Sequence, residues 1–267
     1  MQDKPDQTQS VTDPLDPARA RAMEATLGAA PSIQSGDPLP PFFHQLYFWD
    51  PRPPQELGRD GHPKTGGFIP DMGLPRRMWA AGKLTFHSAL LAGVRAERRS
   101  AIESLTRKDG KTGPLAFMRI RHDILQRGGL VLTEWQDIVY RQDPAPDAVT
   151  PAPPVAATDE ERSLVRGFDS TALFRYSALT FNGHRIHYDK PYAQAVEGYP
   201  GLVVHGPLLA QMLMLLAEEA LGRPLREFGY RATAPLFDGE EAAFCWKAGR
   251  LWVRGSDGRQ CMEAAAT

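Results

Sequence analysis

The most apolar part of the chain covers residues 208–217, where Gln211 is the one polar interruption. A helix drawn through this stretch has apolar side chains on nearly every side, so almost no polar face is left to meet water. We therefore predict a helix that other parts of the structure surround. Its ends are marked by Gly206 as the N-cap, Pro207 at the first helical position and Gly222 as the C-terminal stop.

After this helix, short runs of β-forming residues are separated by pairs of turn residues such as Asp-Gly and Ala-Gly. Runs of this length between such turns are typical of strands joined as hairpins. The predicted strands cover residues 230–237, 241–248, 250–255 and 260–266. A further short strand is expected before the helix, around residues 173–179. The second half of the chain is thus predicted to be a buried helix followed by an antiparallel meander.

The first half of the chain has the same order of elements. A helix-like stretch over 16–30 leads to an apolar segment over 40–49, and a Gly- and Pro-rich excursion follows over 50–75. The strands predicted after it cover 94–108, 115–126 and 130–141, with turns at 108–111 and at Gly128 and Gly129.

A Pro- and Ala-rich segment between the halves has neither helical nor strand periodicity, which predicts a linker over 143–163. The linker divides the chain into an N-terminal unit, 1–142, and a C-terminal unit, 164–267. Two units that each combine a helix with a meander predict an α+β fold of the double hotdog type. In that fold we expect two long antiparallel sheets, each wrapped around a central apolar helix.

Charge and cysteine content exclude several classes of protein. The net charge of −1 offers nucleic acid no general electrostatic attraction. Cys245 and Cys261 form no CxxC pair, so neither a zinc ribbon nor a disulfide framework is indicated. The N-terminal residues carry no apolar signal segment, and residues 208–217 are too few to span a bilayer. We expect a cytoplasmic protein that binds neither nucleic acid nor membrane.

Candidate chemistry concentrates in the stretch FNGHRIHYDKPYA, which begins at Phe181. His184 and His187 lie three residues apart in it, and two such histidines can simply be surface residues beside a turn. A metal site is a second interpretation, because residues of types that bind metals gather here. Its ligands would be His184, His187, Asp189 and His205. The HxxH pattern lacks the glutamate of a zinc-protease helix, however, and we expect no metal.

The same stretch, followed by GYPGLVVHGPLLAQML, resembles the hydratase motif of the MaoC-like (R)-specific enoyl-thioester hydratases and 3-hydroxyacyl-thioester dehydratases. Within that family it is similar to a longer subset, which includes mesaconyl-C4-CoA hydratase, itaconyl-CoA hydratase and the mitochondrial dehydratase. The likeness continues through LGRDGHPKTGGFIP, PRRMWAAGKLTF, EWQDIVYR and FGYRATAPLFDGE. It covers nearly everything from about Asp37 onward. The family's fold is a double hotdog with the catalytic motif in the C-terminal unit only.

The resemblance implies that Asn182 and His187 activate water and that Gly206 begins the helix at the site. Hydration of an enoyl thioester needs a base near neutral pH, a group that orients the water and a donor to the enolate oxygen. His187 fits the base, because an imidazole has an ordinary pKa of ~6.5. Asn182 can hold the water, and the Gly206 N–H can donate from the positive end of the helix. The short hydratases have aspartate in place of Asn182, so the site here is a variant.

Further residues are expected to contact the substrate: His184, Tyr188, His205, Arg76, Arg77 and Trp79. His184 is expected near the thioester end, and His205 is expected to orient the helix. Arg76 and Arg77 can either be a solvated strand edge or supply a guanidinium to a carboxylate or phosphate. No metal or redox cofactor is implied.

The activity implied is reversible hydration of an enoyl-CoA, or dehydration of a 3-hydroxyacyl thioester carried by CoA or acyl-carrier protein. A C4–C5 dicarboxylic acyl group, such as mesaconyl, itaconyl or citramalyl, needs a cationic partner, whereas a long aliphatic chain needs an apolar tunnel. Both alternatives stay open. Two other functions are considered, a hotdog thioesterase and a non-catalytic acyl-thioester binder. A thioesterase would need a carboxylate near the helix to activate water, and the position of Glu218 and Glu219 at the far end of the helix argues against it. We expect a monomeric double hotdog or a homodimer.

Overall fold

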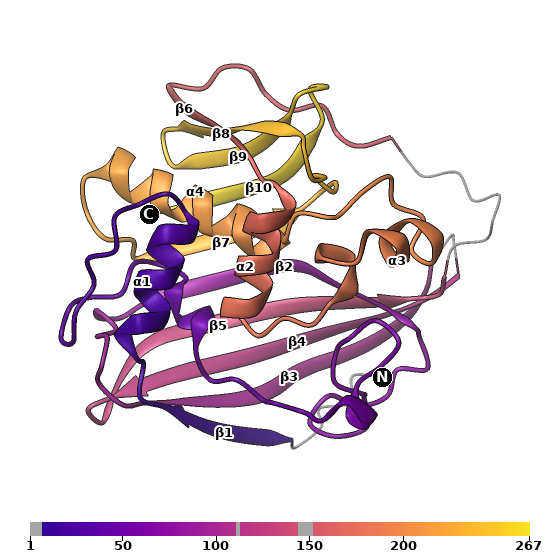
Figure 1. Ribbon diagram of the computed structural model, residues 1–267, viewed down its shortest axis with the longest axis horizontal. Helices are drawn as coiled ribbons and strands as arrows, with labels where there is room; N and C mark the ends of the chain where they lie inside the picture. The colour runs from indigo at the N-terminus through magenta and orange to yellow at the C-terminus, as the bar shows by residue number, and fades with distance from the viewer. Residues whose placement is uncertain (1–6, 111–112, 144–151) are drawn as a thin grey trace.

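The structure, a computed structural model, describes residues 7–110, 113–143 and 152–267. Figure 1 shows the helices gathered against a large sheet. The strands are β1 Thr8–Asp13, β2 Arg76–Phe86, β3 Ala96–Gly110, β4 Gly113–Gln126, β5 Gly129–Arg141, β6 Arg162–Gly167, β7 Glu227–Ala232, β8 Glu241–Lys247, β9 Arg250–Gly255 and β10 Gln260–Ala266. The helices are α1 Pro17–Thr26, α2 Ser170–Leu179, α3 Lys190–Ala195 and α4 Gly206–Leu221, with 3-10 helices η1 Phe43–Leu46, η2 Pro54–Glu56 and η3 Arg185–His187.

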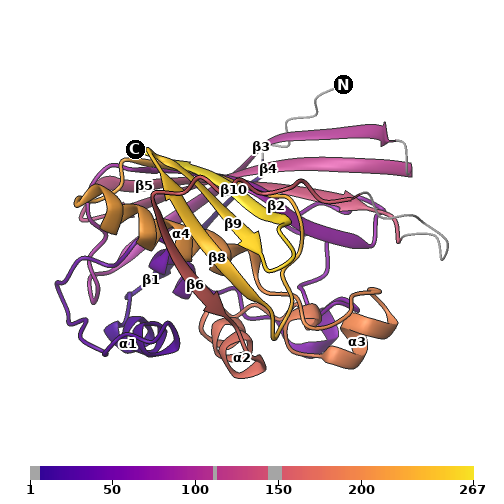
Figure 2. The ribbon, with the colours of Figure 1, turned by 90° about the horizontal axis from the view of Figure 1, so that it is seen from above.

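The described strands form a single antiparallel sheet in the order β1-β3-β4-β5-β2-β7-β10-β9-β8-β6. Strands β1 to β5 come from the first half of the chain and β6 to β10 from the second. The halves meet where β2 pairs with β7, from Ala81 opposite Arg231 to Thr85 opposite Glu227. The predicted α+β class is confirmed, but the two expected sheets are joined edge to edge as one. Figure 2 shows the helices on one side of this curved sheet.

Helix α4 is the predicted apolar helix, and it packs against β7 to β10. Gly222 ends it in the left-handed conformation, with φ of 64°, which glycine adopts without steric cost. Its start lies one residue earlier than predicted: His205 is the N-cap, and Gly206 is the first helical residue. Of the four strands predicted after the helix, the last three are confirmed as β8 to β10, whereas the first, predicted over 230–237, is shifted and ends at Ala232 in β7.

The strand expected over 173–179 is wrong, because this segment is helix α2. Asp169 caps the helix by accepting a hydrogen bond of 2.8 Å from the Ala172 N–H. Leu173, Tyr176 and Ser177 are buried at helical spacing. A short apolar run of this length fits either element, and here the cap and the spacing favour the helix.

The first half also differs from the prediction of a central apolar helix. Its predicted helix exists as α1, but only Ala20 and Met23 of α1 are buried. The centre of the unit is instead filled by the segment 42–48, which forms η1 and irregular backbone. Phe42 and Phe48 adopt positive φ angles of 70° and 60°, which no α-helix allows.

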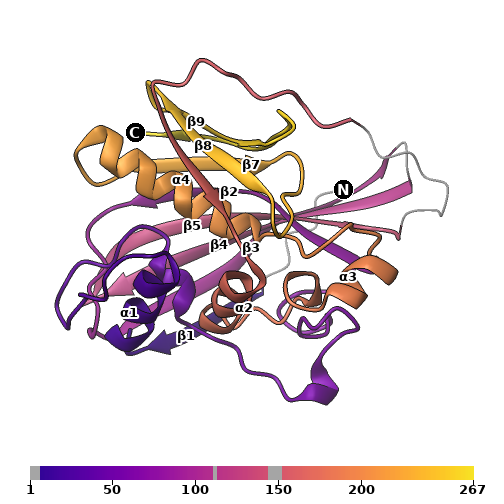
Figure 3. The same cartoon turned by 45° about the horizontal axis from the view of Figure 1, so that its top comes forward.

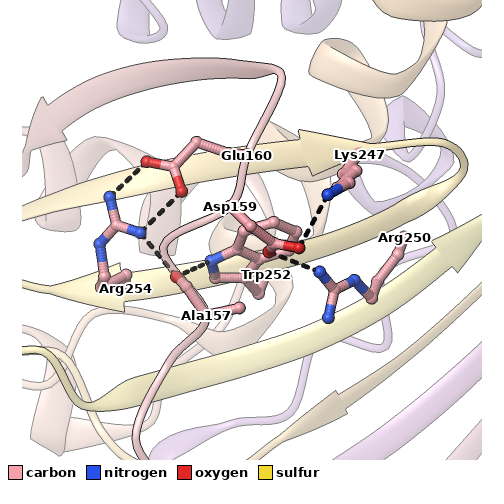
Figure 4. Close-up of polar contacts among 7 residues, drawn as sticks. All are labelled: Ala157, Asp159, Glu160, Lys247, Arg250, Trp252 and Arg254. Atoms are coloured by element: carbon pink, nitrogen blue, oxygen red, sulfur yellow. Dashed lines mark hydrogen bonds and ion pairs between the residues drawn. The ribbon is translucent and has the colours of Figure 1, made fainter.

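Part of the predicted linker, 144–151, lies outside the described residues. Residues 152–161, which we call the strap, cross β8 and β9 on the side opposite α4 (Figures 2 and 4). The Ala157 carbonyl accepts hydrogen bonds from Trp252 Nε1 at 2.9 Å and from Arg254 at 2.6 Å, and Glu160 pairs with Arg254. Among the described residues, no helix is both long and apolar enough to cross a membrane.

Candidate active site

Asn182 and His187 lie on residues 180–189, the short segment between α2 and α3 that we call the catalytic segment. Gly206 lies at the start of α4 (Figure 3). His187 is the last residue of η3, and its side chain is buried, with 6% of the residue exposed. Its Nδ1 lies 2.7 Å from the carbonyl oxygen of Val203, which precedes α4. A carbonyl only accepts hydrogen bonds, so Nδ1 must carry the proton. Nε2 is then the free acceptor of the ring.

The protonation state of His187 follows from its surroundings. Burial lowers the pKa of His187 to about 4, and this effect outweighs the hydrogen bond to Val203, which by itself raises it. The imidazole is therefore neutral at pH 7. A neutral imidazole with a free Nε2 lone pair is the form that a general base requires.

His205 supports the ring of His187 from the side. The two imidazoles are stacked, with centroids 3.6 Å apart and planes 20° from parallel. His205 Nε2 lies 2.8 Å from the Ser177 hydroxyl, and the residue is completely buried. Burial lowers the pKa of His205 well below the ordinary value, so the stacked pair carries no charge at pH 7. The structure thus places His205 behind His187, at the N-cap of α4.

Gly206 follows His205 directly, so its N–H lies at the start of α4 close to the stacked imidazoles. Within the described ranges the Gly206 N–H has no acceptor. A Cβ built on Gly206 would meet no atom within 4 Å, so the space beside this residue is open. A free N–H at a helix N-terminus can donate to a developing oxyanion, and the absence of a side chain on Gly206 leaves room for a substrate to approach it.

Asn182 lies at the beginning of the same segment. Its backbone N–H donates to the Ser177 carbonyl at 2.8 Å, and its side-chain Oδ1 accepts the His184 backbone N–H at 3.0 Å. These bonds fix the position of the side chain and leave its NH₂ group available. Asn182 can therefore hold a water molecule by donating to it.

His184 and Tyr188 occupy the outer part of the segment. The ring of His184 stands perpendicular to that of His187, with centroids 5.4 Å apart, and burial lowers the pKa of His184 to about 2. Tyr188 is 45% exposed, and its hydroxyl donates to the Gly183 carbonyl at 2.8 Å. The structure therefore brings Asn182, His184 and His187 together as predicted, with Tyr188 at the surface.

The residues predicted from the first half separate into different environments. Arg76 is buried, donates to the Glu197 carbonyl oxygen at 2.8 Å and forms an ion pair with the Glu197 carboxylate. Its charge is thus already neutralised. Trp79 donates from Nε1 to the Ala81 carbonyl at 3.0 Å and packs on Phe42 in the main core.

The guanidinium of Arg77 makes no hydrogen bond or ion pair with any residue that the structure describes. Its charge nevertheless reaches the site. Arg77 contributes to lowering the pKa values of His62 and His184, after the larger effect of burial on each. Of the two predicted arginines, Arg77 is thus the one whose positive charge is not neutralised by a described ion pair and acts on His62 and His184.

Asp60 and His62 are not among the site residues predicted from the sequence, although the glycine-rich stretch that contains them belongs to the family resemblance. The ring of His62 lies 4.5 Å from that of His184. The signal that could have identified it is the stretch GRDGH, in which a single glycine, Gly61, separates a carboxylate from an imidazole.

The side chains with metal-binding chemistry do not group as the HxxH interpretation required. Asp189 pairs with Arg185 and caps α3. The described cluster with suitable ligand types is Asp60, His62 and His184, whose ligand atoms lie within 4.8 Å of one another. The positive charge of Arg77 beside His62 and His184 opposes a cation there.

Comparison with known proteins finds relatives that match most of the chain. The family model of hydroxyacyl-thioester dehydratase type 2 matches residues 42–238. The mesaconyl-C(4)-CoA hydratase of Chloroflexus aurantiacus is 48% identical over 237 residues, which are 86% of this chain and 83% of that protein. The mitochondrial hydroxyacyl-thioester dehydratase type 2 of Schizosaccharomyces pombe is 26% identical over 80% of each chain.

Solved structures agree with the predicted fold. A Mycobacterium tuberculosis protein with a double hotdog fold aligns with a TM-score of 0.61 at 16% identity, over 100% of this chain and 94% of that one. The double hotdog predicted from the sequence is therefore confirmed, as is the family resemblance.

Proposed function

The chain belongs to the hydroxyacyl-thioester dehydratase type 2 family and is a hydro-lyase, and on that premise we propose that it hydrates an enoyl-CoA whose β-carbon carries a free carboxylate. The reaction is reversible and also runs as dehydration of the corresponding 3-hydroxyacyl-CoA. The proposal concerns the acyl group, the CoA carrier and the residues that perform the chemistry.

The reaction begins with a water molecule held by the Asn182 amide. His187 Nε2 takes one proton from this water while the water oxygen forms a bond to the β-carbon of the substrate. The electron pair of the double bond moves toward the thioester carbonyl, whose oxygen accepts the Gly206 N–H. His187 then returns its proton to the α-carbon, which gives the 3-hydroxyacyl thioester and restores the neutral imidazole.

The observation that carries this mechanism is the hydrogen bond of 2.7 Å between His187 Nδ1 and the Val203 carbonyl. It assigns the proton to Nδ1 and the lone pair to Nε2. Because Val203 lies three residues before Gly206, the first residue of α4, the same contact holds the base close to the Gly206 donor. Base and oxyanion donor therefore share one rigid support.

The acyl group is inferred from charge. The name of the relative from Chloroflexus aurantiacus specifies mesaconyl-C(4)-CoA. Mesaconate is 2-methylfumarate, so its C4 thioester has the free carboxylate on the carbon that water attacks. A carboxylate buried near the base needs a cationic partner, and Arg77 supplies a positive charge beside His184. Arg76, paired with Glu197, does not.

A thioesterase is less well supported. It would need a carboxylate near the start of α4, whereas Glu218 lies at the far end of the helix and accepts the Leu225 N–H at 3.2 Å. A non-catalytic binder would not need a base held as the Nδ1–H tautomer.

The decisive experiment incubates the protein with mesaconyl-C4-CoA and, separately, with crotonyl-CoA. Loss of the enoyl absorbance without release of free thiol is the expected result, and it should be faster with the dicarboxylic thioester. Release of thiol would indicate a thioesterase, and no change in either signal would indicate a binder. His187→Ala should lower kcat by roughly 10²–10⁴-fold, while His87→Ala, at a histidine beside Thr133, serves as the matched control.

A further inference from the structure

A loop from the first half of the chain, residues 57–64, reaches the catalytic segment of the second half. The loop is closed by a bridge between Leu57 and Pro63 and by a hydrogen bond of 2.7 Å from the Gly58 N–H to the His62 carbonyl. Asp60 Oδ1 also accepts the His62 backbone N–H at 3.1 Å. These contacts make the loop a defined structure that holds its side chains in fixed directions.

The loop docks on the catalytic segment backbone against backbone. A Cβ on Gly61 would lie 2.0 Å from the Gly183 carbonyl oxygen, and a Cβ on Gly183 would lie 2.5 Å from that of Gly61. The Arg185 N–H donates to the Asp60 carbonyl at 2.8 Å. Gly183 lies between Asn182 and His184, so the loop touches the part of the segment that carries the proposed chemistry.

The docked loop presents an imidazole backed by a carboxylate. His62 Nδ1 lies 2.9 Å from Asp60 Oδ2, so Nδ1 donates and Nε2 is left without a partner among the described residues. The ring of His62 lies 4.5 Å from that of His184, which in turn lies 5.4 Å from the ring of His187. His184 thus forms contacts with both His62 and the catalytic base.

The charged and titratable groups that face His62 come from three parts of the chain. They are Asp60 on its own loop, Arg77 on β2, and His184 and His187 on the catalytic segment. Burial lowers the pKa of His62, Arg77 lowers it further, and Asp60 opposes both. Without substrate the imidazole is neutral at pH 7. An added carboxylate next to Nε2 and Arg77 reverses this balance, because it stabilises the imidazolium from the side opposite Asp60.

We propose that His62, held by Asp60, determines substrate specificity by binding the free carboxylate of the acyl group together with Arg77. The Nε2 atom takes up one proton from solvent as the dicarboxylic thioester binds, and then donates it as a hydrogen bond to the carboxylate. No proton is consumed in the reaction itself, since this one is released with the product. The inference rests on the proposed function and extends it to a residue of the other unit.

The experiment compares kcat/KM for mesaconyl-C4-CoA with kcat/KM for crotonyl-CoA between pH 6 and pH 9. The ratio of the two isolates the carboxylate, because titration of His187 affects both substrates alike. The substrate carboxylate stays ionised throughout this range. The fraction of enzyme in which His62 can take up a proton therefore determines how binding of the dicarboxylic thioester changes with pH. In the wild type the ratio should fall as pH rises, by up to about tenfold per unit above the pKa of His62 in the free enzyme.

His62→Gln retains a polar side chain but cannot be protonated. We expect this variant to lower the ratio by roughly 10–10²-fold at pH 6.5, as for loss of one charge-assisted contact, and to abolish its dependence on pH. Asp60→Asn should act in the same direction, because the imidazolium loses its anionic partner. His87→Gln is the matched control, and it should leave the ratio and its pH dependence as in the wild type.

The possible outcomes distinguish a failure of the proposed function from a failure of the proposal for His62. If the wild type hydrates neither thioester, the proposed function fails. If it hydrates both and His62→Gln depresses both equally, His62 only supports the loop and the present proposal is overturned. Activity that falls on chelation with both substrates and returns with Zn²⁺ would also overturn it, since Asp60 and His62 would then be metal ligands. Thermal unfolding of each variant checks that the fold is intact.

Discussion

Replacing Gly61 by alanine tests whether the N-terminal loop completes the active site. The Cβ of the new residue would lie 2.0 Å from the Gly183 carbonyl oxygen, a separation that must grow to at least 3.0 Å. Both neighbours are backbone, so the loop and the catalytic segment have to move apart by about 1 Å. A displacement of this size near reacting groups lowers turnover by about 10²-fold, which corresponds to about 2.7 kcal/mol of activation free energy.

The matched control is Gly36→Ala. Gly36 has a φ of 93°, close to the 88° of Gly61, but a Cβ at this position would meet nothing within 4 Å. Each substitution should therefore lower the stability of the folded state by a similar conformational strain of about 1–2 kcal/mol. Only the substitution at Gly61 also separates the two backbones.

The assay has two parts: denaturant unfolding for stability and enoyl absorbance for kcat/KM with crotonyl-CoA. Gly36→Ala should lose stability alone, whereas Gly61→Ala should lose about 10²-fold in kcat/KM under conditions where it is fully folded. Crotonyl-CoA is the appropriate substrate because it has no carboxylate, so the result does not depend on His62. If folded Gly61→Ala is as active as Gly36→Ala, the contact between the loop and Gly183 does not position the catalytic segment.

Three further predictions concern the site and its support. Arg76→Met should lower the free energy of unfolding by about 3–5 kcal/mol, because it leaves the Glu197 carboxylate buried without its partner. Arg175→Met, at an exposed position on α2, is the control, and equal stabilities of the two variants would refute the role of the pair. Asn182→Ala should lower kcat more than it raises KM, since water positioning matters mainly in the transition state, and a wild-type kcat would remove Asn182 from the mechanism. Because burial lowers the pKa of His187 to about 4 and only the neutral ring accepts a proton, kcat/KM for crotonyl-CoA should stay level from pH 8 to pH 6 and fall toward pH 4; a midpoint at 6.5 would contradict this.

The sequence predicts the fold well where local signals agree with one another. Helix α4 was predictable because its apolar residues, its proline at the start and Gly222 at its end all indicate the same element. Helix α2 was not, because its apolar run is short enough for a strand and its cap, Asp169, is a residue that also occurs in turns. The irregular backbone at Phe42 and Phe48 carries no local signal, since aromatic residues rarely adopt positive φ.

The candidate site likewise has a part that the sequence predicts and a part that it does not. Asn182, His184, His187 and Gly206 lie on one stretch of sequence, and the family motif identifies them together. The docking of the loop around Gly61 depends on a contact between backbones from different halves, for which the sequence of either half holds no local requirement. Arg76 and Arg77 were predictable only in part. Strand alternation predicts that their side chains point to opposite faces of the sheet, but which of the two charges is neutralised depends on the position of Glu197 in the other half of the chain.

The pairing of β2 with β7 determines how the site responds to dilution. Two separate hotdog subunits that joined along such an edge would dissociate at low concentration, and a site that needs residues from both would be lost. Here both edges belong to one chain, so their effective concentration is set by the connection between them and does not change with the amount of protein. The turnover number per chain is therefore expected to stay constant at concentrations where a two-subunit version would already have come apart.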